Sequence, residues 1–440
     1  MTFIKVRNMQ AIKRIPSFII LIFLLYACQT ASMPAASEPA VESAAASLTE
    51  TRPPETETTE TSNEPPTLPA SPTASAAPEE PVRAIILLIG DGMGAAQREA
   101  ARLASLGLEG ALAMDTMPVQ GWSQTAADPQ LITDSAAGAT ALASGIKTSN
   151  GRIGMDKDGD PLPTILEQAQ ERGWAVGLVT TVNVADATPA AFAAHVSHRD
   201  DMEGIALQMF EARVDVLLGG GEDQFLPEGV RGCFSGFGQR DDNRNLIEEA
   251  QAEGYNFLCD GQALASFDTV GAPRLLGLFA DEGMLRPFVP DLITMTQAAV
   301  EILSQDEDGF FLMVEGGQID WAAHDNQGAE TIASTIGFDA AVAFTRAYAE
   351  ANPNTLVIVT ADHETGGMSV TLEEEGTFRL EGPFAMPDGA PFWVDWTTSG
   401  HTPVDVPVSA QGPFSDLLAG IYPNTFIYDV MYAALTGQLP

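Results

Sequence analysis

The chain has 440 residues, of which 60 are acidic and 21 are basic, and its formal net charge of −39 makes nucleic acid and anionic lipid surfaces poor partners. Its length allows one large domain or two ordinary ones, and a change of composition before residue 83 favours one. This excess of carboxylates with only four lysines is typical of a saline working environment, where salt screens the repulsion, although a merely soluble acidic surface has the same composition.

The first 28 residues have the pattern of an export signal. A basic start is followed by a mostly apolar run over residues 15–27. Because about 20 apolar residues are needed to cross a bilayer, this shorter run predicts a secretory signal peptide. The run ends in the letters LYAC, which resemble a bacterial lipobox with Cys28 as the acylated residue. We therefore expect an extracytoplasmic protein anchored by lipid to the cell envelope, and a plain cleaved signal is the alternative.

Residues 29–82 are predicted to form a disordered linker. The segment is rich in Pro, Thr, Ser, Ala and Glu and contains no aromatic residue. Such a composition cannot bury enough apolar surface to offset the entropy lost on ordering. The folded domain is therefore expected over residues 83–440.

From residue 83 the pattern changes to short apolar runs that alternate with helical stretches. The apolar runs are Ala84 to Ile89, Val176 to Val182, Val214 to Leu218, Phe310 to Val314 and Leu356 to Thr360. The helical stretches are Ala136 to Ser144, Pro163 to Arg172, Met202 to Ala212, Leu292 to Ser304 and Ala329 to Glu350. Continuous apolar runs suit strands that are buried on both faces of a mainly parallel sheet. The alternation predicts a three-layer α/β/α sandwich.

Acidic residues follow four of the predicted strands at their carboxyl ends. They are Asp91, Asp186, Glu315 and Asp362. In open α/β sheets ligands bind along this edge, so we expect these side chains to meet at one rim.

Two regions, 219–290 and 373–396, are rich in loop-forming residues and are expected to lie at the periphery. The first contains Cys233 and Cys259. If Cys28 carries lipid, these two remain to pair, and an exported chain favours a disulfide between them. Two free buried thiols are the alternative.

Several polar residues have spacings that suit a reactive site. Asp320 and His324 are four residues apart, so on a helix they share a face and can bind one metal ion, although a surface pair would have the same spacing. Ser135 precedes an alanine-rich helical stretch, and a helix N-terminus favours an anion there, although an ordinary capping serine is common. The fork of Arg199 can grip two phosphate oxygens, and a surface ion pair is its alternative role.

Seven segments, taken in chain order, resemble the motifs of the alkaline phosphatase family. They are 91–94 (DGMG), 133–141 (TDSAAGATA), 186–189 (DATP), 195–199 (HVSHR), 315–324 (EGGQIDWAAH), 360–364 (TADHE) and 399–401 (SGH). The resemblance covers residues 83–432 and implies the fold of that family. It also implies hydrolysis of small phosphate monoesters, and a homodimer as an expected assembly.

The resemblance implies two zinc ions and one magnesium ion. The implied ligands are Asp320, His324 and His401 for the first zinc, Asp91, Asp362 and His363 for the second, and Asp91, Thr188 and Glu315 for magnesium. Mixed His and Asp ligation suits zinc, and an all-oxygen set suits magnesium.

The same resemblance implies that Ser135 attacks phosphorus and forms a phosphoserine intermediate. Arg199 would hold the phosphate, and Asp186 and Trp321 would lie beside it. The best-known bacterial member has a lysine directly after the aspartate of this zinc motif, where this chain has Trp321. We therefore expect the charge around the phosphate and the magnesium to differ.

Three rival functions fit parts of the pattern. A phosphodiesterase of the same superfamily commonly uses threonine as nucleophile, and a sulfatase needs a modified residue in a different motif, so the sequence around Ser135 favours a monoesterase. A lipid-tethered protein that binds phosphate or metal without turnover is the third rival. The presence of Ser135 together with all the implied metal ligands argues against it.

Overall fold

A ten-stranded sheet organises the computed structural model, which describes residues 82–372 and 381–438. Its strand order is β15-β2-β14-β8-β1-β7-β3-β4-β6-β5. The strands are β1 (Ala84–Ile89), β2 (Val119–Gln124), β3 (Ala175–Asn183), β4 (Val216–Gly220), β5 (Asn256–Leu258), β6 (Leu275–Leu278), β7 (Phe310–Glu315), β8 (Thr355–Thr360), β14 (Val406–Gln411) and β15 (Gly420–Pro423). From β8 to β5 every pair is parallel, and β14 runs antiparallel to both of its neighbours.

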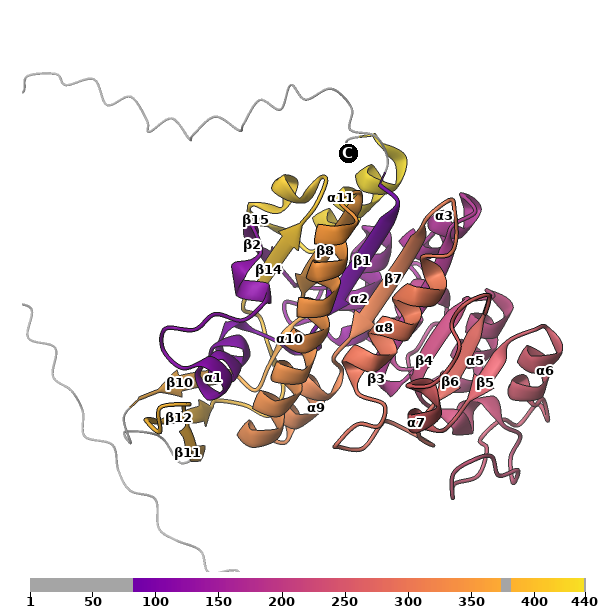
Figure 1. Ribbon diagram of the computed structural model, residues 1–440, viewed down its shortest axis with the longest axis horizontal. Coiled ribbons are helices and arrows are strands. Elements are labelled where there is room, and N and C mark those ends of the chain that lie inside the picture. Colours follow the sequence, from indigo (N-terminus) through magenta and orange to yellow (C-terminus); the bar gives the residue numbers. More distant parts are fainter. Residues whose placement is uncertain (1–81, 373–380, 439–440) are drawn as a thin grey trace, which may run out of the picture. The chain divides into compact units, whose positions relative to one another are not determined.

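Helices cover both faces of this sheet, as Figure 1 shows. They are α1 (Ala95–Leu106), α2 (Ser135–Ser144), α3 (Ile165–Glu171), α4 (Ala187–Ala193), α5 (Met202–Glu211), α6 (Leu246–Ala252), α7 (Gly261–Leu264), α8 (Leu292–Leu303), α9 (Gln318–His324), α10 (Gly328–Ala351) and α11 (Thr425–Thr436). Short 3-10 helices span η1 (Met114–Thr116), η2 (Glu222–Phe225) and η3 (Ser415–Leu418).

The alternation of side chains along β1 separates two hydrophobic cores. Ile85 and Leu87 pack with α2, α3, α4, α5 and α11 on one face, and Ile86 and Leu88 pack with α8 and α10 on the other. Both faces of β1 are fully buried, which explains its unbroken apolar run. The predicted three-layer α/β/α sandwich is confirmed.

The carboxyl ends of the parallel strands meet at one rim of the sheet. Ile89 at the end of β1 is in register with Glu315 on β7 and with Thr360 on β8. Glu315 is in turn in register with Thr180 on β3. Segments that are far apart in sequence therefore deliver their next residues to the same edge.

Two smaller sheets flank the main one. Strands β10 (Met368–Thr371), β12 (Pro391–Trp396) and β11 (Glu381–Ala385) form an antiparallel sheet, which accounts for the described part of the predicted loop-rich region 373–396. Strands β9 (Glu364–Thr365) and β13 (His401–Thr402) pair with each other and form the second small sheet. The other predicted loop-rich region, 219–290, has long loops but also contributes β5 and β6 to the edge of the main sheet.

The predicted signal peptide over residues 1–28, its lipid attachment at Cys28, and residues 29–81 of the predicted linker lie outside the described residues. Val82, the last residue of that linker, is buried and donates its N–H to the carbonyl of Ala434 at 3.0 Å. None of the described helices combines the length and the apolar character that crossing a membrane requires.

Shortening a side chain of the central strand should destabilise the fold. Leu87 is fully buried between β7 and β8, so Leu87→Ala should lower the free energy of unfolding by about 2–5 kcal/mol. Leu108, which is 54% exposed, provides the matched control, and Leu108→Ala should change the free energy of unfolding by less than about 0.5 kcal/mol. Chemical denaturation measures both values, and equal effects of the two variants would contradict the assignment of the core.

Candidate active site

Ser135 begins α2 at the rim of the sheet. The preceding residue, Asp134, caps the helix by accepting a hydrogen bond from the N–H of Ala137 at 3.0 Å. The helix closely approaches the segment that follows β8 at Gly138, where an added Cβ would lie 3.1 Å from the carbonyl oxygen of Asp362. This approach places Ser135 Oγ 3.2 Å from Nε2 of His363. The hydroxyl thus lies in the positive field of a helix N-terminus, beside a potential metal ligand.

One cluster of ligand atoms lies directly under Ser135. It comprises Asp91, Asp362 and His363, whose candidate ligand atoms all lie within 4.8 Å of one another. His363 Nε2 is 3.1 Å from Asp362 Oδ2 and 3.6 Å from Asp91 Oδ1. These two carboxylate oxygens are buried and have no hydrogen-bond partner. Since buried carboxylate oxygens without a partner are costly, their convergence fits a bound cation.

A second cluster lies against the first. His324 Nε2 is 3.0 Å from His401 Nε2 and 3.3 Å from Asp320 Oδ2, and His401 Nε2 is 3.7 Å from Asp320 Oδ1. Ligands at about 2.0–2.1 Å from a tetrahedral zinc ion lie roughly 3.3 Å apart, so these spacings suit one ion. The imidazole of His401 stacks on that of His363 with ring centres 3.6 Å apart, which brings the two clusters into contact.

The hydrogen bonds of two histidines fix which ring nitrogen faces the cluster. His324 Nδ1 lies 2.7 Å from the carbonyl oxygen of Ser399, and His401 Nδ1 lies 2.8 Å from that of Thr133. A carbonyl oxygen can only accept, so each Nδ1 carries a proton. In the neutral rings both Nε2 atoms therefore present lone pairs to the cluster, as metal ligands must.

Oxygen ligands gather beside Asp91. Glu315 is buried at the end of β7, and Thr180 donates to its Oε2 at 2.5 Å. Thr188 Oγ1 is buried and makes no hydrogen bond of ordinary geometry, although it lies close enough to Glu315 to lower the pKa of that carboxyl. Together with Asp91, these groups form an all-oxygen set of the kind that magnesium prefers.

The buried carboxylates repel one another. Burial, followed by the charges of Asp362 and Asp320, raises the pKa of Asp91 well above its usual value. Burial raises the pKa of Glu315 to about 8, and burial together with the charge of Asp320 raises that of Asp362 to about 6. Without cations at the rim, these groups therefore keep their protons up to a higher pH than isolated carboxyl groups do.

The histidines respond in opposite directions. The hydrogen bond between His324 and Asp320 raises the pKa of His324 to about 9. Burial raises the pKa of Asp320, but its hydrogen bond to His324 and the neighbouring histidine charges outweigh burial and lower it to about 2. Burial and the charge of His401 hold the pKa of His363 well below its usual value, so this ring is neutral.

Arg199 reaches the site from the loop after α4. Its Nη2 donates to Asp186 Oδ1 at 2.9 Å, and its Nη1 lies 3.6 Å from Asp134 Oδ2. Burial lowers the pKa of Arg199, but the charges of Asp186 and Asp134 outweigh burial and raise it. The guanidinium therefore stays charged and is held beside the residue that precedes Ser135.

Trp321 directly follows Asp320 on α9, but its ring does not enter either cluster. The residue is 41% exposed, its ring packs over Gly283, and it lines a cavity that also includes Asp186. The sequence-based expectation placed both Asp186 and Trp321 beside the phosphate. The structure joins Asp186 to Arg199 by a hydrogen bond and places Trp321 among the residues that line the adjoining cavity.

The sequence analysis did not identify Thr365, which links the two clusters. Its hydroxyl donates to Asp320 Oδ1 at 2.5 Å, and its Oγ1 lies 3.2 Å from Nδ1 of His363. Because the hydroxyl proton goes to Asp320, the ring nitrogen must donate to Thr365, and Nε2 of His363 is left with a lone pair. Only its position directly after the segment 360–364 could have identified it. The sequence analysis also missed Thr180, which donates a hydrogen bond to Glu315.

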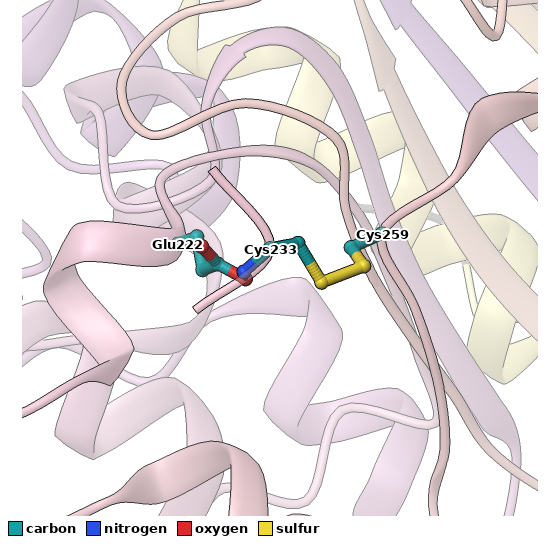
Figure 2. Close-up of side chains that lie close together, drawn as sticks. All are labelled: Glu222, Cys233 and Cys259. Carbon is teal, nitrogen blue, oxygen red and sulfur yellow. A yellow bond between two sulfur atoms is a disulfide. The ribbon is translucent and has the colours of Figure 1, made fainter. Parts of the chain in front are cut away.

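A third group of potential metal ligands lies elsewhere. Cys233 and Cys259 are joined in a disulfide, and Glu222 accepts a hydrogen bond from the N–H of Cys233 at 2.9 Å, as Figure 2 shows. Since the sulfurs are bonded to each other, they are not available as thiolate ligands. His195 also lies apart from the two clusters, with its ring nitrogens beside Glu167 and the carbonyl of Gly154.

Comparisons with known proteins agree with this geometry. A family model described as alkaline phosphatase matches residues 82–384. Streptomycin-6-phosphate phosphatase of Streptomyces griseus is 40% identical over 83% of this chain and 94% of its own length. Among solved structures, the alkaline phosphatase of the Antarctic bacterium TAB5 is 31% identical, with a TM-score of 0.70 over 82% of this chain and 100% of its own. A variant of that enzyme with magnesium bound in its M3 site is also 31% identical, with a TM-score of 0.69 over 81% of this chain and 98% of its own. The chain therefore belongs to the alkaline phosphatase family and is a phosphatase.

Proposed function

We propose that the chain hydrolyses phosphate monoesters through a phosphoserine intermediate on Ser135, at a site that holds two zinc ions and one magnesium ion. The observation that carries the proposal is the convergence of unpartnered ligand atoms on Ser135. Asp91 Oδ1 and Asp362 Oδ2 lack hydrogen-bond partners, and His363 Nε2 lies between them and the hydroxyl. The name of the relative from Streptomyces griseus denotes a phosphorylated small molecule, which supports a monoester.

The donor sets fit the proposed ions. In this proposal Asp320, His324 and His401 hold one zinc, and Asp91, Asp362 and His363 hold the other. Asp91, Thr188 and Glu315 supply only oxygen and suit magnesium. The related TAB5 variant has magnesium bound in its M3 site, which supports a magnesium site in the family. When bound, the divalent cations lower the pKa of the serine hydroxyl and balance the charge of the phosphate.

In this proposal Ser135 is the nucleophile, and the residues around it orient the reacting groups. Ser135 Oγ forms a bond to phosphorus, the bond from phosphorus to the ester oxygen breaks, and the alcohol leaves with a proton. Water then attacks the same phosphorus, which releases inorganic phosphate and restores the hydroxyl. The N-terminus of α2 directs its free N–H groups toward the charge that develops there, and the cap by Asp134 keeps the first turn ordered.

Arg199 is proposed to hold two oxygens of the phosphate. Its Nη2 is bound to Asp186, so the fork is oriented before substrate arrives. A monoester has three non-bridging oxygens and can engage both the cations and this fork. That geometry favours a monoester over a diester, which has only two such oxygens.

Removing the nucleophile should abolish turnover. Ser135→Ala should lower kcat/KM for an aryl phosphate at least about a thousandfold, because no other hydroxyl occupies its place. Ser144→Ala at the other end of α2 is the matched control and should retain activity. A chelator should abolish the activity of the unmodified chain. Tight phosphate binding without chelator-sensitive product would instead indicate a binding protein.

Stability should depend on pH in the absence of metal but not when metal is bound. In chelator, Glu315 and His324 hold protons in the folded state up to about pH 8 and 9, whereas they release them at lower pH when unfolded. Their raised pKa values therefore contribute stability that is lost as pH rises, so the Tm in chelator should fall between about pH 6.5 and 9. Saturating zinc and magnesium should remove the fall, because metal replaces those protons. A Tm in chelator that is constant or rises over this range would contradict the assignment.

Thr365 should control metal affinity without touching substrate. Thr365→Val keeps the shape but removes the hydroxyl that orients Asp320 and His363, so the dissociation constant for zinc should rise about 10–100-fold. Thr335, which is equally buried and donates to the carbonyl of Thr331 within α10, provides the matched control. Competition with a chromogenic chelator measures zinc affinity. Equal losses in the two variants would argue against this role.

A further inference from the structure

A cavity of about 660 Å³ adjoins the candidate active site, and its lining is acidic. Seven of its 13 lining residues are Asp or Glu, and none is Lys, Arg or His. Asp186 forms part of the wall and also accepts the hydrogen bond from Arg199. A group attached to a phosphate held by Arg199 can therefore extend into this space.

The acidity of this cavity does not simply follow from the excess of acidic residues in the whole chain. Another cavity, of about 740 Å³, also contains carboxylates, but two of its three are paired: Asp215 lies 3.3 Å from Arg274, and Glu253 lies 3.4 Å from Arg213. In the acidic cavity, among the residues that the structure describes, no Lys or Arg lies within ion-pair distance of Asp223, Asp241 or Glu282. Its charge is therefore largely uncompensated.

Asp223 is a buried carboxylate in the wall of this cavity, and one of its oxygens has no partner. This residue is only 6% exposed, and its Oδ1 has no hydrogen-bond partner, while Oδ2 accepts from the side chain of Gln224. Burial, with a contribution from the charge of Glu282, raises the pKa of Asp223 to about 6. At neutral pH this buried carboxylate, which accepts a hydrogen bond on only one of its oxygens, remains charged, and a bound cation would stabilise it.

Trp321 adds an aromatic surface to the same cavity. The residue is 41% exposed, and its ring packs over Gly283, next to Glu282. An aromatic face beside carboxylates is a suitable environment for an ammonium or guanidinium group. The residue that replaces a lysine of the best-known bacterial relative thus faces a cavity from which positive side chains are absent.

We propose that this cavity is a subsite for the alcohol portion of the substrate, and that it favours phosphate monoesters whose alcohol carries an ammonium or guanidinium group. The inference rests on the proposed monoesterase function. The zinc and magnesium ligands and Arg199 bind the phosphate, while Asp223, Glu282 and Trp321 contact the cationic end. Anionic alcohols are disfavoured by the same charges.

A pair of isosteric substrates tests the proposal on the full chain loaded with zinc and magnesium. Aminohexyl phosphate and heptyl phosphate differ only in an ammonium in place of a methyl group. The kcat/KM of the cationic ester should exceed that of the neutral one by about tenfold or more at low salt, mainly through KM. The ratio should shrink at high salt, because ions screen exposed charges.

Removing charges from the cavity wall should lower this ratio. The double variant Asp241→Asn/Glu282→Gln should reduce it about threefold or more, since each carboxylate contributes a modest attraction in water. The control Glu171→Gln/Glu307→Gln changes the net charge equally at exposed positions outside the cavity and should leave the ratio unchanged.

The two proposals can fail separately. Equal kcat/KM values for the two esters, or a ratio that both double variants change alike, would overturn the cationic subsite while Ser135-dependent hydrolysis of both esters upheld the monoesterase. If neither ester yielded Ser135-dependent phosphate, both proposals would be overturned.

Discussion

The mutual repulsion of buried carboxylates at one rim of the sheet is the constraint on which the site depends. Parallel strands bring Asp91, Glu315 and Asp362 to this rim because their ends are in register. Burial and neighbouring negative charge raise the pKa values of all three groups. In the proposed function, divalent cations at this rim offset the repulsion, and the same cations are what phosphate chemistry requires.

The surrounding hydrogen bonds direct the ligands. Backbone carbonyls of Thr133 and Ser399 accept from the Nδ1 atoms of His401 and His324, and Thr365 bridges Asp320 and His363. These partners lie on the segments that also carry the proposed nucleophile and the proposed metal ligands, so those segments are held together. The positive fork of Arg199 stands apart, held by Asp186 and Asp134 at the boundary with the acidic cavity. In the proposed function, phosphate binding and alcohol binding are thereby separated.

The sequence predicted the fold well, because the fold depends on local patterns. The run Ala84 to Ile89 was identified to the residue, since a strand buried on both faces is apolar throughout. Acids after strand ends marked the rim. The antiparallel strand β14 was missed, because its short run gave no sign of its direction or partners. Thr365 and Thr180 were missed because a threonine that orients a ligand is indistinguishable in sequence from any other buried threonine.

The cavity beside Arg199 could not be predicted from the sequence either, since its acidic residues are spread along the chain from Asp186 to Glu282 and meet only in the folded protein. The most direct test of the central claim is anomalous X-ray diffraction from crystals of the full chain grown with zinc. The account predicts two strong peaks roughly 4 Å apart, one among Asp320, His324 and His401, and one among Asp91, Asp362 and His363 beside Ser135. The absence of both peaks from these positions at full zinc saturation would contradict it.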